Sequence, residues 1–125
     1  MEQDTTSFEI RTLEKTYSSS SDRIDYEVIN KTQNEISFGY ACLLEKWDGE
    51  VWKRYPVSGY GMYPEVAISL RPGETVRESF SLAGLEEPLE AGRYRLVKTL
   101  VRNTYYAEFE VPSILVKSVE KEVSE

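Results

Sequence analysis

Carboxylates are the most numerous side chains in this chain that could do chemistry, with 22 Asp and Glu among 125 residues. Two of them in one pocket could act as a general acid and a general base. Nearly all, however, fall in turns or at outward positions of predicted strands, which is typical of a solvated acidic surface. Asp22, Asp25, Asp48 and Glu50 could offer oxygen ligands to calcium, but they lack the dense spacing of a dedicated calcium loop. We therefore predict neither a catalytic pair nor a metal site.

Other kinds of centre are excluded by the residue types that are missing. Histidine is absent and Cys42 is the only cysteine. This rules out serine-histidine and cysteine-histidine catalysis, a disulfide framework and a zinc site built from one chain. The seven glycines fall singly at turns, so there is no glycine-rich phosphate loop either. The sequence predicts no enzyme and no cofactor, and Cys42 is expected to be buried as a small hydrophobic residue.

Two groups of aromatic residues could contact a partner. The first is the irregular stretch 55–64, whose composition suits contact with a peptide or a sugar from a rigid scaffold. Its candidate residues are Tyr55, Tyr60, Met62 and Tyr63. The alternative is that this stretch simply folds over an open end of the domain.

The second group lies at outward positions of predicted strands. It contains Leu43, Trp47, Trp52, Val97 and Tyr106. If the strands display these side chains together, they form an apolar patch large enough to indicate a partner. The alternative is that the strand carrying Trp52 bends and turns this side chain inward.

Charge and hydropathy restrict the partners further. The 22 acidic and 15 basic residues give a net charge of −7, which disfavours nucleic acids and anionic membranes by repulsion. No apolar run approaches the ~20 residues of a membrane helix, and the start Met-Glu-Gln-Asp-Thr-Thr lacks a signal-peptide pattern. We predict no nucleic-acid partner and no membrane insertion by this segment, with any signal or anchor outside it.

Alternation of apolar and polar residues predicts seven or eight short strands and no helix before residue 112. The strands are expected over 7–13, 23–30, 38–47, 50–55, 66–70, 75–82, 93–101 and 104–111. This pattern is typical of an all-β, immunoglobulin-like antiparallel β-sandwich. We predict one such domain over residues 1–112, followed by a tail or linker over 113–125.

Two turns set the pairing of four of these strands. Asp48-Gly49 is typical of a two-residue hairpin turn, because both positions tolerate positive φ. The last two strands are joined through Arg102-Asn103. If both turns hold two residues, the expected cross-strand pairs are Glu45 with Trp52, Cys42 with Tyr55, Leu96 with Phe109, Tyr94 with Val111 and Arg95 with Glu110.

Tyr94 occupies the point around which the predicted sandwich is arranged. It follows Gly92 by two residues and precedes Leu96 by two, as in the tyrosine corner of immunoglobulin-like domains. In that corner the ring enters the core and the hydroxyl bonds back to the loop backbone. The alternative is that Gly92 and Tyr94 start some other kind of β-strand.

Lys98 and Glu78 are charged residues at positions where alternation calls for apolar ones. Lys98 is expected on the inward face opposite Ala107, and Glu78 on the inward face of the opposite sheet. Sheets about 10 Å apart allow two long side chains of opposite charge to meet. Either they form a semi-buried ion pair, or each reaches water separately around a bulge.

The combined pattern resembles a family of bacterial immunoglobulin-like domains found in envelope and secreted proteins of Gram-positive bacteria. The segments that carry the resemblance are 13–17, 24–31, 44–52, 70–74 and 92–98, and together they span about residues 8–111. The resemblance implies the sandwich fold and an extracellular or cell-surface setting. It implies no catalytic residues.

The expected function is therefore that of a non-enzymatic module, acting as a spacer or a protein-interaction domain. The alternative is a carbohydrate-binding module that holds a cell-wall glycan with its exposed aromatic residues. A hydrolase with a pair of carboxylates is a third, weaker possibility. The residues expected to contact a ligand or partner are Trp52, Tyr55, Tyr60, Met62, Tyr63 and Tyr106.

Overall fold

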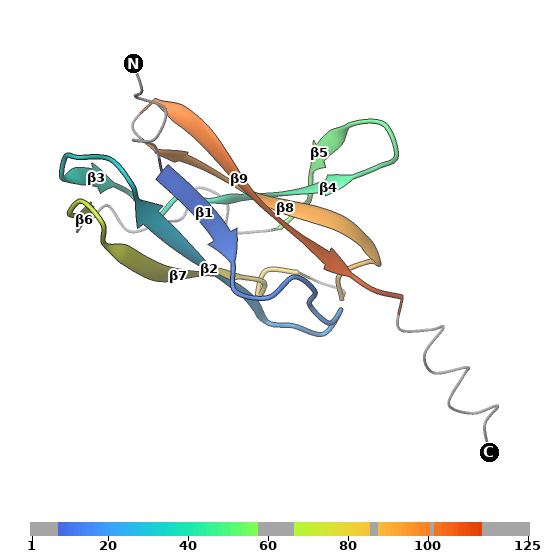
Figure 1. Ribbon diagram of the computed structural model, residues 1–125. Helices are drawn as coiled ribbons and strands as arrows, with labels where there is room; N and C mark the ends of the chain where they lie inside the picture. The colour runs from blue at the N-terminus through green and yellow to red at the C-terminus, as the bar shows by residue number, and fades with distance from the viewer. Residues whose placement is uncertain (1–7, 58–66, 86–87, 101, 114–125) are drawn as a thin grey trace.

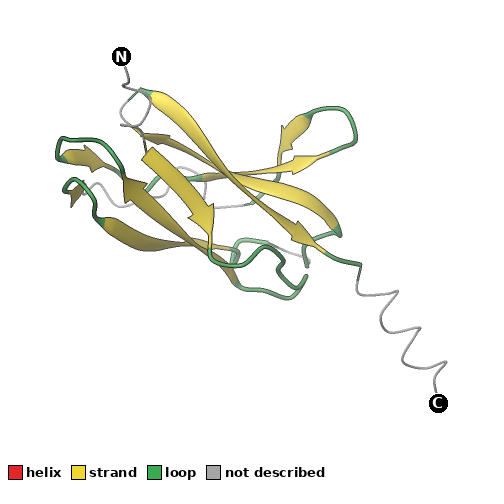
Figure 2. Ribbon diagram, in the orientation of Figure 1, coloured by secondary structure: helices red, strands yellow, loops and turns green. Residues whose placement is uncertain are grey.

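The computed structural model describes residues 8–57, 67–85, 88–100 and 102–113, and within them every regular element is a β-strand (Figure 1, Figure 2). The nine strands are β1 (Phe8–Thr12), β2 (Arg23–Asn30), β3 (Ile36–Phe38), β4 (Leu43–Trp47), β5 (Trp52–Arg54), β6 (Ile68–Leu70), β7 (Thr75–Ser81), β8 (Gly92–Leu100) and β9 (Asn103–Val111).

The strands form two larger sheets and one small one. Strands β1-β2-β7 make one sheet, β5-β4-β8-β9 make another, and β3 pairs with β6, always with antiparallel neighbours. The two larger sheets lie face to face in Figure 1, and their inward residues form one hydrophobic core. The predicted antiparallel β-sandwich is confirmed, with nine strands in place of seven or eight.

One predicted strand is divided in two. Residues 38–47 were expected to be continuous, but β3 and β4 belong to different sheets and the chain crosses between them over residues 39–42. The carbonyls of Gly39 and Ala41 each accept a hydrogen bond of 3.0 Å from the Lys98 ammonium, in place of a neighbouring strand. Phe38 and Cys42 remain buried on either side of the crossing, which is why the alternation looks unbroken in the sequence.

The hairpin of β4 and β5 has a longer turn than expected. Trp47 lies opposite Trp52, so four residues connect the strands and the predicted pairs of Glu45 with Trp52 and Cys42 with Tyr55 are wrong. The Asp48 carboxylate accepts the backbone N–H groups of Glu50 at 2.8 Å and Val51 at 2.9 Å, which closes the wider loop. These bonds, that of Val51 first, hold the pKa of Asp48 at about 2.

The hairpin of β8 and β9 turns one residue earlier than expected. Leu100 lies opposite Asn103, in place of the predicted closure around Arg102-Asn103. The observed pairs are Leu96 with Ala107, Tyr94 with Phe109, Arg95 with Glu108 and Lys98 with Tyr105, in place of the predicted ones. The pairing changes by two residues, and because side chains alternate with period two, the inward and outward faces stay as predicted.

The tyrosine corner is confirmed. The Tyr94 hydroxyl donates a hydrogen bond of 2.7 Å to the carbonyl of Glu90, and the whole residue is inaccessible to solvent. Its ring stacks on Phe109, with centroids 5.4 Å apart and an angle of 9° between the planes. The corner thus ties the loop before β8 to the centre of the core.

Tyr94→Phe is expected to lower the free energy of unfolding by about 1–2 kcal/mol, because the variant keeps the ring and loses one buried hydrogen bond. Tyr40→Phe is the control, since Tyr40 is exposed and should change stability by less than about 0.5 kcal/mol. Chemical denaturation measures both. Equal stability of the two variants would show that the corner bond contributes nothing.

Lys98 and Glu78 meet between the two sheets, as one of the two sequence hypotheses held. The Lys98 nitrogen lies 3.4 Å from Oε1 of Glu78, and the side chains are 1% and 5% exposed. The Tyr26 hydroxyl donates a hydrogen bond of 2.6 Å to the same oxygen. Among the described residues, Oε2 of Glu78 is the buried side-chain oxygen without a hydrogen-bond partner. Lys98 is therefore the cation that compensates this carboxylate.

Cys42 is expected to be unreactive while the domain is folded. It is 3% exposed, and burial raises the pKa of its thiol to about 11. At about pH 8 the thiolate that attacks disulfide reagents is therefore scarce as well as covered. A chromogenic disulfide reagent should react with the thiol only after a denaturant is added. Rapid reaction of the native protein would contradict the buried position.

Candidate functional site

The outward face of the β5-β4-β8-β9 sheet carries a cluster of aromatic and arginine side chains. We call the set Trp47, Trp52, Arg93, Arg95 and Tyr106 the aromatic-arginine face. Its arginines alternate along β8 with residues of the core, which places them on the solvent side. Trp47 and Trp52 face each other across the β4-β5 hairpin.

Each aromatic ring of this face has a guanidinium group against it. The Arg95 guanidinium lies 4.4 Å from the ring centre of Trp52 and 3.9 Å from that of Tyr106. The Arg93 guanidinium lies 5.7 Å from the ring centre of Trp47 and 5.5 Å from that of Trp52. The two tryptophan rings are themselves 5.4 Å apart. The cations and rings therefore hold one another in a fixed arrangement.

Two carboxylates form ion pairs with the arginines of the face. Nε of Arg95 lies 2.8 Å from Glu45, with both side chains 18% exposed. Arg93 lies 3.2 Å from Glu108, and both of these side chains are about half exposed. The first pair is well shielded and orients Arg95, whereas the second is open to water and contributes little to stability. Arg93 and Glu108 are consequently available to a partner at low cost.

The structure places the predicted outward patch on this face. Leu43, Val97 and Tyr106 are neighbours across β4, β8 and β9, and Tyr106 is 47% exposed. Trp52 does not turn inward, since it packs on Trp47 and Arg95. Arg93 and Arg95 were not predicted as part of the patch, although their outward positions on either side of Tyr94 could have indicated them.

The remaining candidate residues lie elsewhere. Tyr55 packs edge-on against the buried ring of Tyr94, with centroids 5.3 Å apart, and belongs to the margin of the core. Tyr60, Met62 and Tyr63 lie outside the described residues. The site that the structure assembles is therefore centred on Trp52 and Tyr106.

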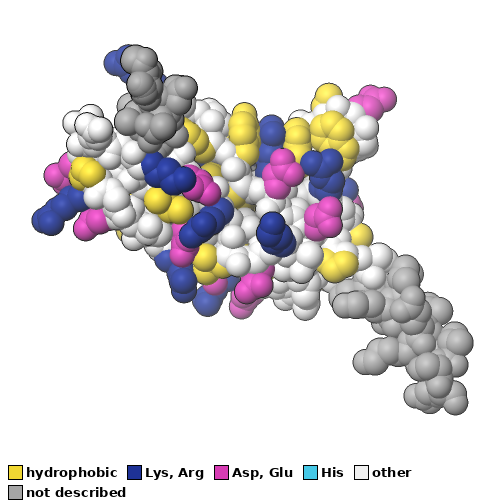
Figure 3. All heavy atoms as spheres, in the orientation of Figure 1, with side chains coloured by type: hydrophobic (Ala, Val, Ile, Leu, Met, Phe, Trp, Pro, Cys, Tyr) yellow, Lys and Arg dark blue, Asp and Glu magenta, His cyan; other side chains and the backbone are white. Residues whose placement is uncertain are grey.

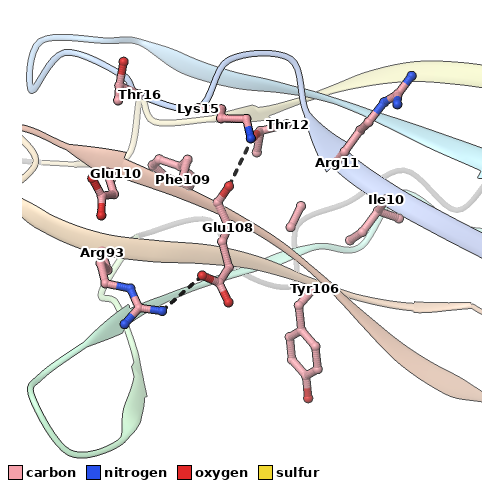
Figure 4. Close-up of a pocket in the computed structure, with 11 residues that line it drawn as sticks. Ile10, Arg11, Thr12, Lys15, Thr16, Arg93, Tyr106, Glu108, Phe109 and Glu110 are labelled. Atoms are coloured by element: carbon pink, nitrogen blue, oxygen red, sulfur yellow. Dashed lines mark hydrogen bonds and ion pairs between the residues drawn. The ribbon is translucent and has the colours of Figure 1, made fainter.

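A groove adjoins the aromatic-arginine face between β1 and β9. It has a volume of about 590 Å³ and is lined by residues of β1, Lys15, Thr16, β9 and Arg93. Tyr106 and Arg93 belong to both surfaces, and Glu108, which pairs with Arg93, lines the groove beside them. Figure 4 shows Arg93 directed at Glu108 on the side of β9 that is remote from β1. A ligand could thus contact the face and the groove together.

Three other classes of site, namely nucleic-acid, metal and membrane sites, would each require a characteristic feature in the described residues. Figure 3 shows cationic and anionic side chains interspersed over one side of the molecule, without a continuous basic area. Residues 8–57, 67–85, 88–100 and 102–113 contain no group of three or more acidic or cysteine side chains that could hold a metal ion. In the same ranges no helix has the length and apolar character needed to cross a membrane.

A family model described as bacterial Ig-like domain matches residues 4–110. The chain belongs to the bacterial Ig-like domain family. The match covers all nine strands apart from the last residue of β9, and it confirms the family resemblance derived from the sequence. No curated protein sequence matches this Ig-like domain significantly.

Among solved structures, the Ig-like domain is similar to part of two β-glucosidases. The enzyme from Erythrobacter marinus is 13% identical with a TM-score of 0.44, over 85% of this chain and 15% of that one. The enzyme from Listeria innocua in complex with gluconolactone is 17% identical with a TM-score of 0.44, over 85% and 16%. The Ig-like domain thus spans about a sixth of the length of these enzymes, and the likeness is too weak to support any argument about its function.

Proposed function

We propose that this Ig-like domain is a non-enzymatic protein-interaction module of a Gram-positive cell-envelope or secreted protein. The observation that supports the proposal is the aromatic-arginine face. Trp, Tyr and Arg are the residues most enriched among those that dominate binding energy at protein interfaces. The face holds all three types in one cluster on a rigid sheet, where little side-chain freedom remains to be lost on binding.

A protein partner suits this face better than a glycan. A sugar that stacks on Trp52 would compete with the Arg95 guanidinium, which lies 4.4 Å from the ring centre. A protein partner can instead contact the rings at their edges and offer carboxylates to Arg93, whose side chain is 48% exposed. The adjacent tryptophans, 5.4 Å apart, keep a cell-wall glycan as the second candidate ligand.

Trp52→Ala is expected to weaken saturable binding of the labelled domain to Gram-positive cells at least tenfold, which corresponds to about 1.4 kcal/mol. Tyr40→Ala removes an exposed tyrosine outside the face and should leave binding unchanged. Flow cytometry on untreated, protease-treated and glycanase-treated cells measures the effect.

The three treatments separate the candidate functions. Binding that depends on Trp52 and is lost after protease treatment would support a protein partner. Binding that survives protease and is lost after glycanase treatment would favour the carbohydrate-binding alternative. A lack of saturable binding to untreated cells would contradict an interaction role and favour a spacer.

A further inference from the structure

The outer edge of β9 is paired at only one end within the described fold. β9 is the last strand of its sheet, with β8 as its ladder partner. At Glu110 the edge is occupied, because its N–H donates to the carbonyl of Lys15 and its carbonyl accepts the N–H of Tyr17, both at 2.9 Å. Backbone groups of an antiparallel strand alternate between its two sides. Those of Glu108 and Tyr106 therefore point to the same outer side as those of Glu110.

These next groups lack a strand partner. In the part of the chain that the structure describes, no backbone group bonds to the N–H or carbonyl of Tyr106 or to the N–H of Glu108 on this side. The Glu108 carbonyl lies 3.4 Å from the Thr12 hydroxyl, whose closer contact is the Glu14 carbonyl at 2.7 Å. The groups that face the groove without a strand partner are therefore the N–H and carbonyl of Tyr106 and the N–H of Glu108.

The groove has the shape and lining for a short extended chain. Its wall opposite β9 is formed by β1, and its apolar part consists of Ile10, Ala107 and Phe109, all nearly inaccessible to solvent. The stretch 106–110 is about 14 Å long at ~3.4 Å per residue. The volume of about 590 Å³ falls inside the range of ~300–1,000 Å³ that ligand sites occupy.

We propose that the groove binds an extended segment of a partner protein, which pairs with Tyr106 and Glu108 as an added strand of the sheet. A polypeptide backbone is the ligand whose donors and acceptors repeat with the spacing of the unpaired groups. Its alternate side chains reach the apolar floor on one side and the aromatic-arginine face on the other. The inference rests on the proposed function in one respect, namely that the partner is a protein.

The chain itself demonstrates the pairing on which the inference depends. Thr16 forms a parallel bridge with Glu110, so the outer edge of β9 accepts a second strand at its carboxyl end. The partner segment occupies the continuation of that position toward Tyr106. A second copy of the domain could offer the same edge, but the net charge of −7 on each copy opposes self-association and favours a different protein.

Amide hydrogen exchange of the whole chain is the first test, because it requires no variant. In the free protein the amides of Tyr106 and Glu108 should exchange rapidly. Those of Ala107 and Phe109, which lie in the ladder with β8, should be protected. Equal protection of all four amides would show that the edge is already covered and would overturn the proposal.

The second test uses linear peptides selected on the protein from a phage-displayed random library. Bound peptide should slow exchange at Tyr106 and Glu108 at least tenfold. Thr12→Tyr, which fills the groove, should weaken peptide binding at least tenfold, whereas the control Thr12→Ser keeps the hydroxyl and should bind normally. Circular dichroism verifies that both variants are folded.

Three results would overturn this inference. One is the recovery of no binding peptide, and another is binding that Thr12→Tyr does not change. The third is dimerisation of the free protein that Thr12→Tyr abolishes, because it would assign the groove to a second copy. Peptides that bind Thr12→Tyr normally but not Trp52→Ala would reject the groove while leaving the proposed function intact.

Discussion

Lys98→Met is expected to lower the free energy of unfolding by about 3–5 kcal/mol, the cost of leaving a buried charge without its partner. The variant keeps the length and apolar stem of the side chain. It removes the cation 3.4 Å from Glu78, and with it both hydrogen bonds that the ammonium donates to the carbonyls of Gly39 and Ala41. Because whole domains are stable by only about 5–15 kcal/mol, this change should be plain in a urea titration.

A double-mutant cycle isolates the Lys98–Glu78 interaction from the loss of the carbonyl contacts. Lys98→Met combined with Glu78→Gln should be more stable than the sum of the two single changes predicts. Lys53→Met is the matched control, since Lys53 pairs with Asp48 at 3.2 Å while its side chain is 68% exposed, and it should cost less than about 1 kcal/mol. Zero coupling in the cycle would show that the two charges are stabilised independently.

Leu96→Ala is expected to cost about 2–5 kcal/mol through loss of buried apolar surface and creation of a cavity. Leu96 is inaccessible to solvent and lies between Leu44 and Ala107 in the sheet. Val97→Ala, one residue along the same strand, points outward and is half-buried, so it should cost clearly less. Denaturation midpoints of both variants provide the measurement. A similar loss for the two would mean that Leu96 does not occupy the centre of the core.

Most of the fold could be predicted from the alternation of apolar and polar residues along the strands. Alternation placed Tyr94, Leu96 and Lys98 inward, and all three are buried. It failed at the turns, because the side chain of Asp48 closes a four-residue loop that a two-residue turn rule does not anticipate. The division of residues 38–47 into β3 and β4 could not be predicted either. It depends on the hydrogen bonds of Lys98 with Gly39 and Ala41, which join positions far apart in the chain.

The candidate site was predictable in part. Trp52 and Tyr106 followed from their outward phase, and the structure brings both against Arg95. The groove could not be anticipated, because it depends on how β1 lies against β9, which no local pattern records. Tyr55 was assigned by composition alone, and its packing on Tyr94 reflects the sheet pairing of its neighbours.

The parallel bridge of Thr16 with Glu110 has a mechanical consequence. The segment that leads out of β1 and the end of β9 run in the same direction there. A pull on the two ends of the sandwich therefore slides these strands along each other and loads both backbone bonds of Glu110 at once. An antiparallel pair pulled from one end would instead open bond by bond. The domain should accordingly resist tension, with a rupture force set by its unfolding rate.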